Sequence, residues 1–179
     1  MIKQLTILTF TLTICLTSCG QTTSSSKNQK QNKMNTLMDT SKIAILPFDK
    51  TLYWVFKDSK PTELTNDDLL KIETILNQCI NDYNLEQEKR FKEIIDKNPK
   101  NNLDKNNFVI DLKQYKRQYI AAINSKGEIE VWINCFCGAG NRNWKTNLIL
   151  VKDGGNCYFN LKVNLTTGQF YELMVNGEA

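Results

Sequence analysis

The residue types that most enzymes use for acid–base or nucleophilic chemistry are missing or scattered in this sequence. Histidine is absent from all 179 residues, which excludes Ser-His-Asp triads, Cys-His pairs and every zinc site that contains histidine. The carboxylates show no spacing typical of a catalytic pair. They are spread over expected turns and strand edges, at Asp111, Glu128, Glu130 and Asp153. We therefore expect a protein that is not an enzyme and that has no metal site and no cofactor.

Four cysteines could form disulfides, bind zinc or act in redox chemistry: Cys79, Cys135, Cys137 and Cys157. In an exported protein, structural bridging is the first interpretation and buried free thiols are the second. A four-cysteine zinc site and redox catalysis through the Cys-x-Cys pair are weaker alternatives, because the spacing is unusual for zinc and all four side chains are expected to face the core. In a simple meander a Cys137 to Cys157 bridge would need a different strand order, whereas Cys79 could cross from a helix to the sheet.

A candidate binding surface combines aromatic and amide side chains, which suit sugar rings or a protein partner. Strand alternation places most of these residues on the face opposite the core, and a loop adds one tryptophan. The set is Trp132, Asn134, Phe136, Tyr158 and Asn160 on strands, with Trp144 in the loop. The alternative is that they form cross-strand pairs on a sheet with one solvent-exposed face, or are covered by the amino-terminal strands.

One long amphipathic helix is expected to lie under that sheet. Thr65 and Asp68 have the spacing of a capping box, and the apolar pattern that follows continues to Ile95 before Asn98-Pro99 ends it. The apolar residues recur at intervals of three and four, at Leu69, Ile72, Leu76, Cys79 and Tyr83.

The periodicity then changes from 3.6 to two, which predicts strands at 115–123, 129–137, 148–151, 157–165 and 170–175. Two short strands or an extended lead-in are expected earlier, at 43–46 and 52–56. Tight turns between the later strands predict an antiparallel meander of four to five strands, with the helix packed across its apolar face. The expected fold class is α+β, a two-layer arrangement similar to the cystatin or NTF2 type.

The amino-terminal segment resembles the signal peptide of a bacterial lipoprotein. Lys3 precedes an apolar run from Leu5 that is too short to span a bilayer, and the run ends in the lipobox-like stretch Leu16 to Cys19. The resemblance implies that residues 1–18 are removed and that Cys19 becomes the lipidated first residue. A plain secretory signal with a chance cysteine is the alternative. Lipidation would anchor the protein in the bacterial cell envelope, by expectation at the outer membrane, with its face undetermined.

Residues 19–41 are expected to form a flexible polar tether, and residues 42–179 a single globular domain. The tether is rich in Ser, Thr, Gln, Asn and Lys and has too few apolar side chains to offset its ordering entropy. The chain has a net charge of +4, and the tether lysines hold most of it, so the domain is close to neutral. A neutral domain lacks the basic surface that nucleic-acid binding requires. Nucleic acid is therefore not expected as a partner.

The second half of the domain resembles uncharacterised lipoproteins and secreted proteins of Bacteroidota, in the stretches YKRQYIAAINSKGEIEVWINCFC, VKDGGNCYFNLKVNL and YELMVNGEA. The resemblance implies no activity for any residue. We expect a membrane-anchored envelope lipoprotein with a non-enzymatic binding or structural role, and a protein or glycan as its partner. The alternative is an immunity-type or inhibitor protein that neutralises a toxin or a protease in the envelope.

Overall fold

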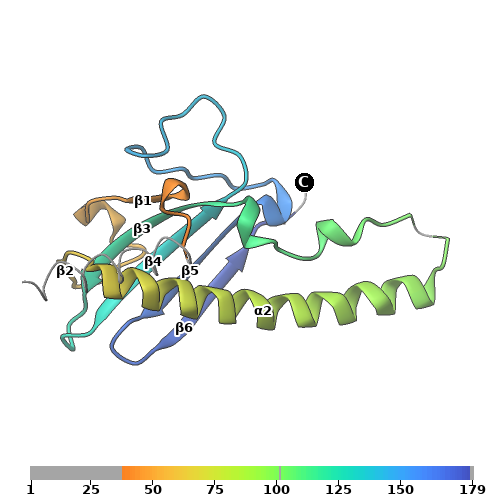
Figure 1. The fold of residues 1–179 in the computed structure, drawn as a ribbon, viewed down its shortest axis with the longest axis horizontal. Coiled ribbons are helices and arrows are strands. Elements are labelled where there is room, and N and C mark those ends of the chain that lie inside the picture. Colours follow the sequence, from red (N-terminus) through yellow and green to blue (C-terminus); the bar gives the residue numbers. More distant parts are fainter. Residues whose placement is uncertain (1–37, 101, 178–179) are drawn as a thin grey trace, which may run out of the picture.

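The fold is α+β, with one long helix packed on an open, mixed β-sheet (Figure 1). It was obtained as a computed structural model, and the structure describes residues 38–100 and 102–177. The predicted signal peptide, Cys19 and most of the predicted tether lie outside the described residues. Over the described part of the chain, the sheet has six strands.

The helix α2 (Asn66–Lys97) begins and packs as the sequence predicts. Its capping box is formed, because the Thr65 hydroxyl accepts a bond from the Asp68 amide at 3.2 Å and the Asp68 carboxylate accepts one from the Thr65 amide at 3.0 Å. The buried stripe faces the sheet and includes Leu69, Ile72, Ile75, Leu76, Cys79 and Ile80. The carboxyl half of α2 extends beyond the sheet, and the chain returns through η3 (Lys105–Asn107) and η4 (Leu112–Gln114) (Figure 1).

The sheet has the strand order β1-β3-β4-β5-β6, and β2 pairs with β3 on the same edge as β1. The strands are β1 (Ile43–Ile45), β2 (Lys60–Pro61), β3 (Lys116–Ile123), β4 (Ile129–Phe136), β5 (Tyr158–Asn164) and β6 (Gln169–Val175). Strands β3 to β6 form the predicted antiparallel meander. β1 differs, because the chain crosses through α2 before it reaches β3 and so returns parallel to β1.

The strand predicted at 148–151 is absent from the described sheet, so the strand order that kept Cys137 and Cys157 apart does not form. The segment belongs to a loop, residues 137–157, that we call the covering loop. Since no strand intervenes, β4 pairs directly with β5, and Phe136 at the end of β4 lies opposite Tyr158 at the start of β5. The residues that flank this pair, Cys137 and Cys157, are therefore neighbours.

Both faces of the sheet are covered, although the predicted fold left one face open. The first face packs on α2, with Val131, Ile133 and Cys135 in that core. On the second face, the amino-terminal cover (residues 44–56) packs on Ile120 and Trp132, and the covering loop packs on Phe136. The expected strand at 52–56 is instead the end of η2 (Lys50–Leu52) and a following turn, capped by the Asp49 side chain.

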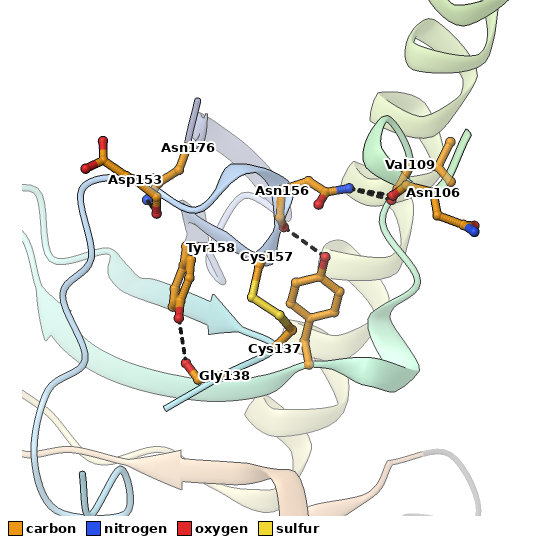
Figure 2. Close-up of a disulfide and its surroundings, with 10 residues drawn as sticks. Asn106, Val109, Cys137, Gly138, Asp153, Asn156, Cys157, Tyr158 and Asn176 are labelled. Carbon is orange, nitrogen blue, oxygen red and sulfur yellow. Dashed lines mark hydrogen bonds between the residues drawn. A yellow bond between two sulfur atoms is a disulfide. The ribbon is translucent and has the colours of Figure 1, made fainter. Parts of the chain in front are cut away.

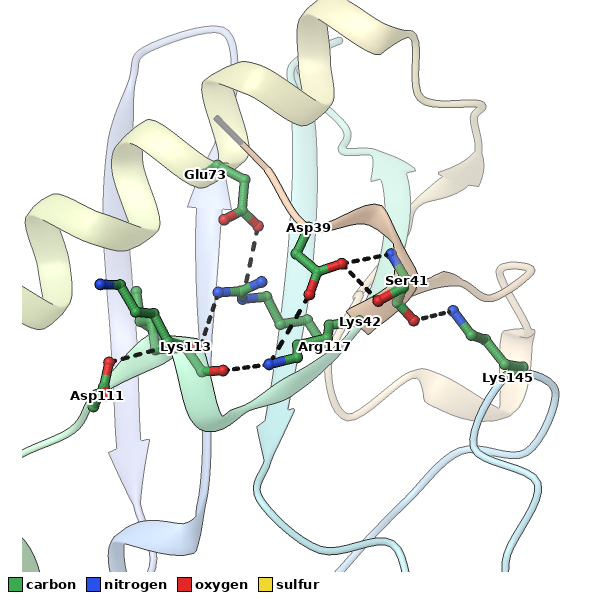
Figure 3. A network of polar contacts seen from close by, with 9 residues as sticks. Asp39, Ser41, Lys42, Glu73, Asp111, Lys113, Arg117 and Lys145 are labelled. Atoms are coloured by element: carbon green, nitrogen blue, oxygen red, sulfur yellow. Dashed lines mark hydrogen bonds and ion pairs between the residues drawn. The ribbon is translucent and has the colours of Figure 1, made fainter. Parts of the chain in front are cut away.

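The chain enters the fold through a polar network around η1 (Thr40–Lys42) (Figure 3). The Lys145 ammonium donates to the carbonyl oxygens of Ser41 and Ile43, at 2.8 and 2.7 Å, and the Lys42 ammonium donates to the carbonyl of Lys113. Met38 is buried in the core under α2. The folded part therefore begins before residue 42, and the predicted tether ends earlier than residue 41.

Candidate functional site: a polar groove at the turn end of the sheet

The aromatic and amide residues predicted as a binding surface are mostly used in packing. Trp132 is 2% exposed, and Asn134 and Phe136 are also buried, because the two covering segments lie over them. Asn160 is half-buried and its side-chain oxygen accepts a bond from the Trp132 indole at 3.2 Å. The side chains point to the predicted face, and the alternative that the amino-terminal segment covers them holds for Trp132, so this part of the face is not an open binding surface.

Trp144 and Tyr158 are also held within the fold. Trp144 is half-buried in the covering loop, with the Lys145 ammonium 4.2 Å from its ring centroid and its own ring edge-on to Phe136. The Tyr158 hydroxyl donates to the carbonyl of Gly138 at 3.0 Å (Figure 2). These contacts fasten the covering loop to the sheet, so the structure does not bring the six predicted residues together as an accessible site.

The cysteines form one disulfide and one buried pair of thiols. Cys137 and Cys157 are bridged beside the Tyr158 bond, at the ends of the covering loop (Figure 2). Cys137 is exposed, so the prediction that all four cysteines face the core was wrong for this residue. Cys79 and Cys135 are free and buried.

Neither free thiol has the properties of a reactive cysteine. Burial raises the pKa of Cys79 to about 11, with a further contribution from the Asp82 charge, and burial raises the pKa of Cys135 well above its ordinary value. In the described part of the chain, no group of three or more Cys, Asp or Glu side chains could hold a metal ion. These two thiols are core residues.

The uncovered part of the second sheet face forms a groove of about 810 Å³ next to the β3–β4 and β5–β6 turns, and we call it the polar groove. Its floor is built by side chains of β4, β5 and β6: Glu130, Lys162, Asn164, Gln169 and Tyr171. Its walls come from the two turns, Glu172 and the chain after η2: Tyr53, Trp54, Val55, Lys57, Asp58, Asn124, Ser125, Lys126, Glu128, Thr167 and Glu172.

Amide side chains hold two carboxylates in place in this groove. The Asn124 amide nitrogen donates to both Glu128 and Glu130, at 2.9 and 2.8 Å, and the Asn164 amide donates to Glu128 at 3.1 Å. The bond from Asn124, followed by that from Asn164, lowers the pKa of Glu128. Glu128 is therefore an ionised hydrogen-bond acceptor at neutral pH.

Tyr171 and Lys162 complete the floor of the polar groove. Burial, and then a hydrogen bond to Glu130, raise the pKa of Tyr171 far above its ordinary value, so this phenol stays protonated. The Lys162 ammonium lies 3.0 Å from a Glu172 carboxylate oxygen and 5.9 Å from the centroid of the Tyr171 ring. The lysine charge is thus already matched by a carboxylate of the groove.

Two aromatic rings stand exposed at the rim. Tyr53 is 76% exposed and Trp54 is 52% exposed, which is unusual for side chains of this size. The Trp54 ring is held in place by an edge-on contact with Trp132, with 5.5 Å between ring centroids and an interplanar angle of 84°. The groove therefore has a positioned aromatic surface above its polar floor.

The backbone adopts left-handed conformations at two groove residues that are not glycine. Asp58 has φ of 52° and Glu172 has φ of 55°. The β5–β6 register shifts between Asn160 and Lys162, close to the strand position of Glu172. Left-handed residues with side chains cost free energy and are enriched at functional sites. Both of them line the same groove, which distinguishes it from the rest of the surface.

Sequence reasoning did not identify this site, because alternation places Lys162 and Asn164 on the outward face of their strand but does not connect them with residues outside that strand. Glu128 and Glu130 were interpreted as solvated charges, and Trp54 as part of a strand. A usable signal exists in the turns: in a meander, the β3–β4 and β5–β6 turns lie at the same end of the sheet. Side chains that flank the two turns on one face, such as Glu130 and Asn164, are then cross-strand partners.

Among the described residues, no helix is long and apolar enough to cross a bilayer. Searches of protein-family models, of curated proteins and of solved structures each find no match to this chain.

Proposed function

We propose that this protein is a lipid-anchored bacterial envelope protein that binds its ligand in the polar groove without chemical conversion. The observation that carries the proposal is the groove itself, where positioned carboxylates and amides lie below the exposed rings of Tyr53 and Trp54. A few fixed polar groups beside aromatic surface are typical of ligand sites. The lipobox that ends at Cys19 supports the anchor, and the outer membrane is the proposed location.

The chemistry of the groove favours binding over catalysis. A general acid must hold a proton near neutral pH, whereas the lowered pKa of Glu128 keeps this carboxylate ionised. The Tyr171 phenol, with its raised pKa, stays protonated near neutral pH and so does not act as a base there. The cystatin- or NTF2-like scaffold type remains part of the proposal, supported by one helix laid across an antiparallel meander.

An inhibitor or immunity role is the second candidate, and the exposure of Tyr53 favours it. Aromatic residues that protrude into solvent are common anchors in protein–protein contacts. Tyr53 is 76% exposed and stands next to Trp54 at the groove rim. A single protein partner retained through this rim would support the second candidate over the first.

Capture from envelope material tests whether the groove binds anything. Full-length protein, in detergent, is immobilised beside the variants Glu130→Gln and Trp54→Ala, with Glu93→Gln as the control because this exposed carboxylate lies on α2 outside the groove. We expect material from solubilised envelopes that wild type and the control retain and that the two groove variants do not. Equal retention by all four proteins would overturn the groove as the binding site.

Replacement of the lipobox cysteine tests the anchor. Cys19→Ala removes the only residue of the lipobox that can carry the lipid, so we expect the variant to be soluble or unprocessed and not in the membrane fraction. Cys79→Ala serves as a control for loss of a cysteine elsewhere in the chain. Recovery of Cys19→Ala in the membrane fraction at the wild-type level would contradict lipidation.

A further inference from the structure

The geometry of the polar groove points to its ligand class: we infer that the groove binds an uncharged saccharide, with a sugar ring on Trp54 and sugar hydroxyls donating to Glu128 and Glu130. This inference rests on the proposed function, because it assumes that the groove is the binding site.

The carboxylates of Glu128 and Glu130 are positioned to accept hydrogen bonds from uncharged donors. Their hydrogen-bond partners are neutral amides and a phenol, not ammonium or guanidinium groups. One oxygen of Glu128, Oε2, receives both of its hydrogen bonds, and the second oxygen has no partner among the described residues. An ionised carboxylate with a free oxygen is a strong acceptor for a hydroxyl group, and each carboxylate can accept two donors side by side.

The aromatic surface fits the apolar side of a sugar ring. A pyranose presents hydroxyl groups at its rim and C–H groups on its faces, so it needs hydrogen-bond partners and an aromatic plane at the same time. Trp54 supplies a large ring that is 52% exposed and is held by Trp132, so little side-chain entropy is lost on binding. The polar floor lies within the same groove as this ring.

The charges in the groove disfavour ionic ligands. Four carboxylates and three lysines line it, and one of these lysines, Lys162, is paired with Glu172. A phosphate or uronate group would meet the ionised Glu128, whose pKa is lowered. A polycation would still meet three lysines, although the four carboxylates leave the groove with one net negative charge. An uncharged, hydroxyl-rich ligand avoids repulsion by Glu128 and needs no ion pair.

The shape of the groove disfavours an extended peptide as the ligand. Peptides commonly bind by adding a strand to a free sheet edge, where the backbone donors and acceptors are unpaired. The groove floor is instead mostly a sheet face, where β4 and β5 are paired on both sides and present only side chains, and β6 at its border is the edge strand. Its volume of about 810 Å³ is within the range of ligand pockets of about 300–1,000 Å³ and accommodates more than one sugar ring.

A panel of oligosaccharides tests the inference directly. Full-length protein is kept in a detergent without a sugar headgroup, because alkyl maltosides would compete for the groove. The probes are neutral oligomers of glucose, mannose, xylose and N-acetylglucosamine, an anionic galacturonic acid oligomer and a cationic glucosamine oligomer. We expect affinity for at least one neutral oligomer that is unchanged between about 0.05 and 0.5 M salt, because no ion pair forms on binding.

The variants show whether such binding uses the proposed contacts. Glu130→Gln and Trp54→Ala are each expected to weaken binding about tenfold or more, because one loses a charge-assisted acceptor and the other the stacking surface. Glu93→Gln should bind as wild type. Glu130→Gln preserves the side-chain shape, so it keeps the test valid if Trp54→Ala is poorly folded. Preference for a charged oligomer, no binding to any neutral oligomer, or equal binding by the groove variants would overturn the inference.

The same capture experiment separates this inference from the proposed function. Material retained by wild type and lost in the groove variants is treated with periodate, which cleaves vicinal diols, or with protease. Release by periodate alone supports a saccharide. Release by protease alone means that the groove binds a protein, so the saccharide inference fails while the proposed binding function stands. If no retention depends on the groove variants, both fail.

Discussion

At the scale of single residues, Gln118 connects the sheet to the covering loop. Its side chain is fully buried on the second face of β3, where its amide nitrogen donates to the carbonyls of Trp144 and Asn147 at 2.7 and 2.8 Å. Its oxygen accepts the Ile149 amide at 3.0 Å and the Asn134 side chain at 3.1 Å. Three backbone groups of the covering loop, in residues 144, 147 and 149, thereby find their partners on one side chain.

Gln118→Leu should therefore be strongly destabilising. The leucine fills the space but leaves several buried backbone groups without partners, at about 1–3 kcal/mol for each. We expect a loss of about 3 kcal/mol or more in the free energy of unfolding, measured by urea denaturation, and faster hydrogen exchange at the Ile149 amide. Gln114→Leu, at an exposed position of η4, is the matched control. Similar stabilities for the two variants would contradict this role for Gln118.

The two tryptophans that contact each other should respond differently to replacement. Trp132 is 2% exposed and packed under the amino-terminal cover, so Trp132→Ala should leave a cavity and cost about 3–5 kcal/mol. Trp54 is 52% exposed, and Trp54→Ala should cost about 1 kcal/mol. Denaturant midpoints of both variants check this. Equal losses would mean that the rim ring is a core residue, and Trp54 would then be unsuited to ligand binding.

At the scale of elements, the disulfide closes the covering loop at the point where it leaves and rejoins the sheet. Cys137 and Cys157 are separated by 20 positions, and the Cys137 amide also donates to the Cys157 carbonyl at 2.9 Å. The backbone pairing thus continues the β4–β5 ladder up to the bridge. The crosslink stabilises the fold mainly by restricting the unfolded chain.

Removal of the bridge should cost a moderate amount of stability without loss of the fold. For a loop of this length, chain entropy predicts a loss of about 3 kcal/mol in the Cys137→Ser, Cys157→Ser double variant. Reduced wild type should unfold at the same denaturant midpoint as the variant. With Cys19 lipidated, the native protein should show no alkylatable thiol, and the unfolded but unreduced chain should show only Cys79 and Cys135. Rapid alkylation of the native protein would contradict this disulfide assignment.

The helix and the meander could be predicted from sequence because their signals are local. The Thr65 capping box and the spacing of Leu69, Ile72 and Leu76 define α2 without knowledge of any other element, and alternation defines β4 and β5. The prediction of a strand at 148–151 was wrong for a physical reason. Ile149 is apolar because it packs as a loop residue on Phe136. A short apolar run is compatible with a strand or with a loop that covers a core, and only tertiary contacts decide between them.

At the scale of the whole molecule, the cover on the second face explains why the groove could not be predicted. The residues over Trp132 come from 44–56, which is distant in sequence from β4, and those over Phe136 come from 137–157, which directly follows this residue and folds back over the face. Alternation identifies the two faces of a strand, but it does not say which parts of a face remain accessible. The groove is the uncovered remainder of that face, and its position depends on where both covering segments end.

The protein should be stable across neutral pH and should lose stability in alkali. Burial raises the folded-state pKa of Tyr119 and of Cys135 above their ordinary values of 10.0 and 9.0. Their contribution is fully present below those ordinary values and is lost as pH rises through the folded pKa, because the unfolded chain then binds fewer protons. Each group is expected to reduce stability by about 1.4 kcal/mol per pH unit in that window.

Urea midpoints measured from pH 6 to pH 11 check this expectation. The midpoint should change little between about pH 6 and 8, since histidine is absent, and should fall above about pH 9. Cys135→Ala should lower the reference stability and reduce the slope in the alkaline range. An alkaline midpoint that stays constant up to pH 11 would mean that the buried phenol and thiol ionise as easily in the folded protein as in the unfolded chain.

The chain enters the fold beside Lys145 and Lys113 (Figure 3). β1 begins opposite Arg117, near the start of β3, whereas the groove floor at Glu130 and Lys162 lies level with Ala122 and Ile120 of β3. At about 3.3 Å per residue, the entry and the groove floor are offset by roughly 10–16 Å along the strand. The Lys145 ammonium and the Lys113 carbonyl, from segments distant in sequence, hold the entry against the fold. If the domain is anchored through Cys19 as proposed, its attachment and its groove lie toward opposite ends of the sheet, so a bound polymer and the attached chain would not compete for the same end of the domain.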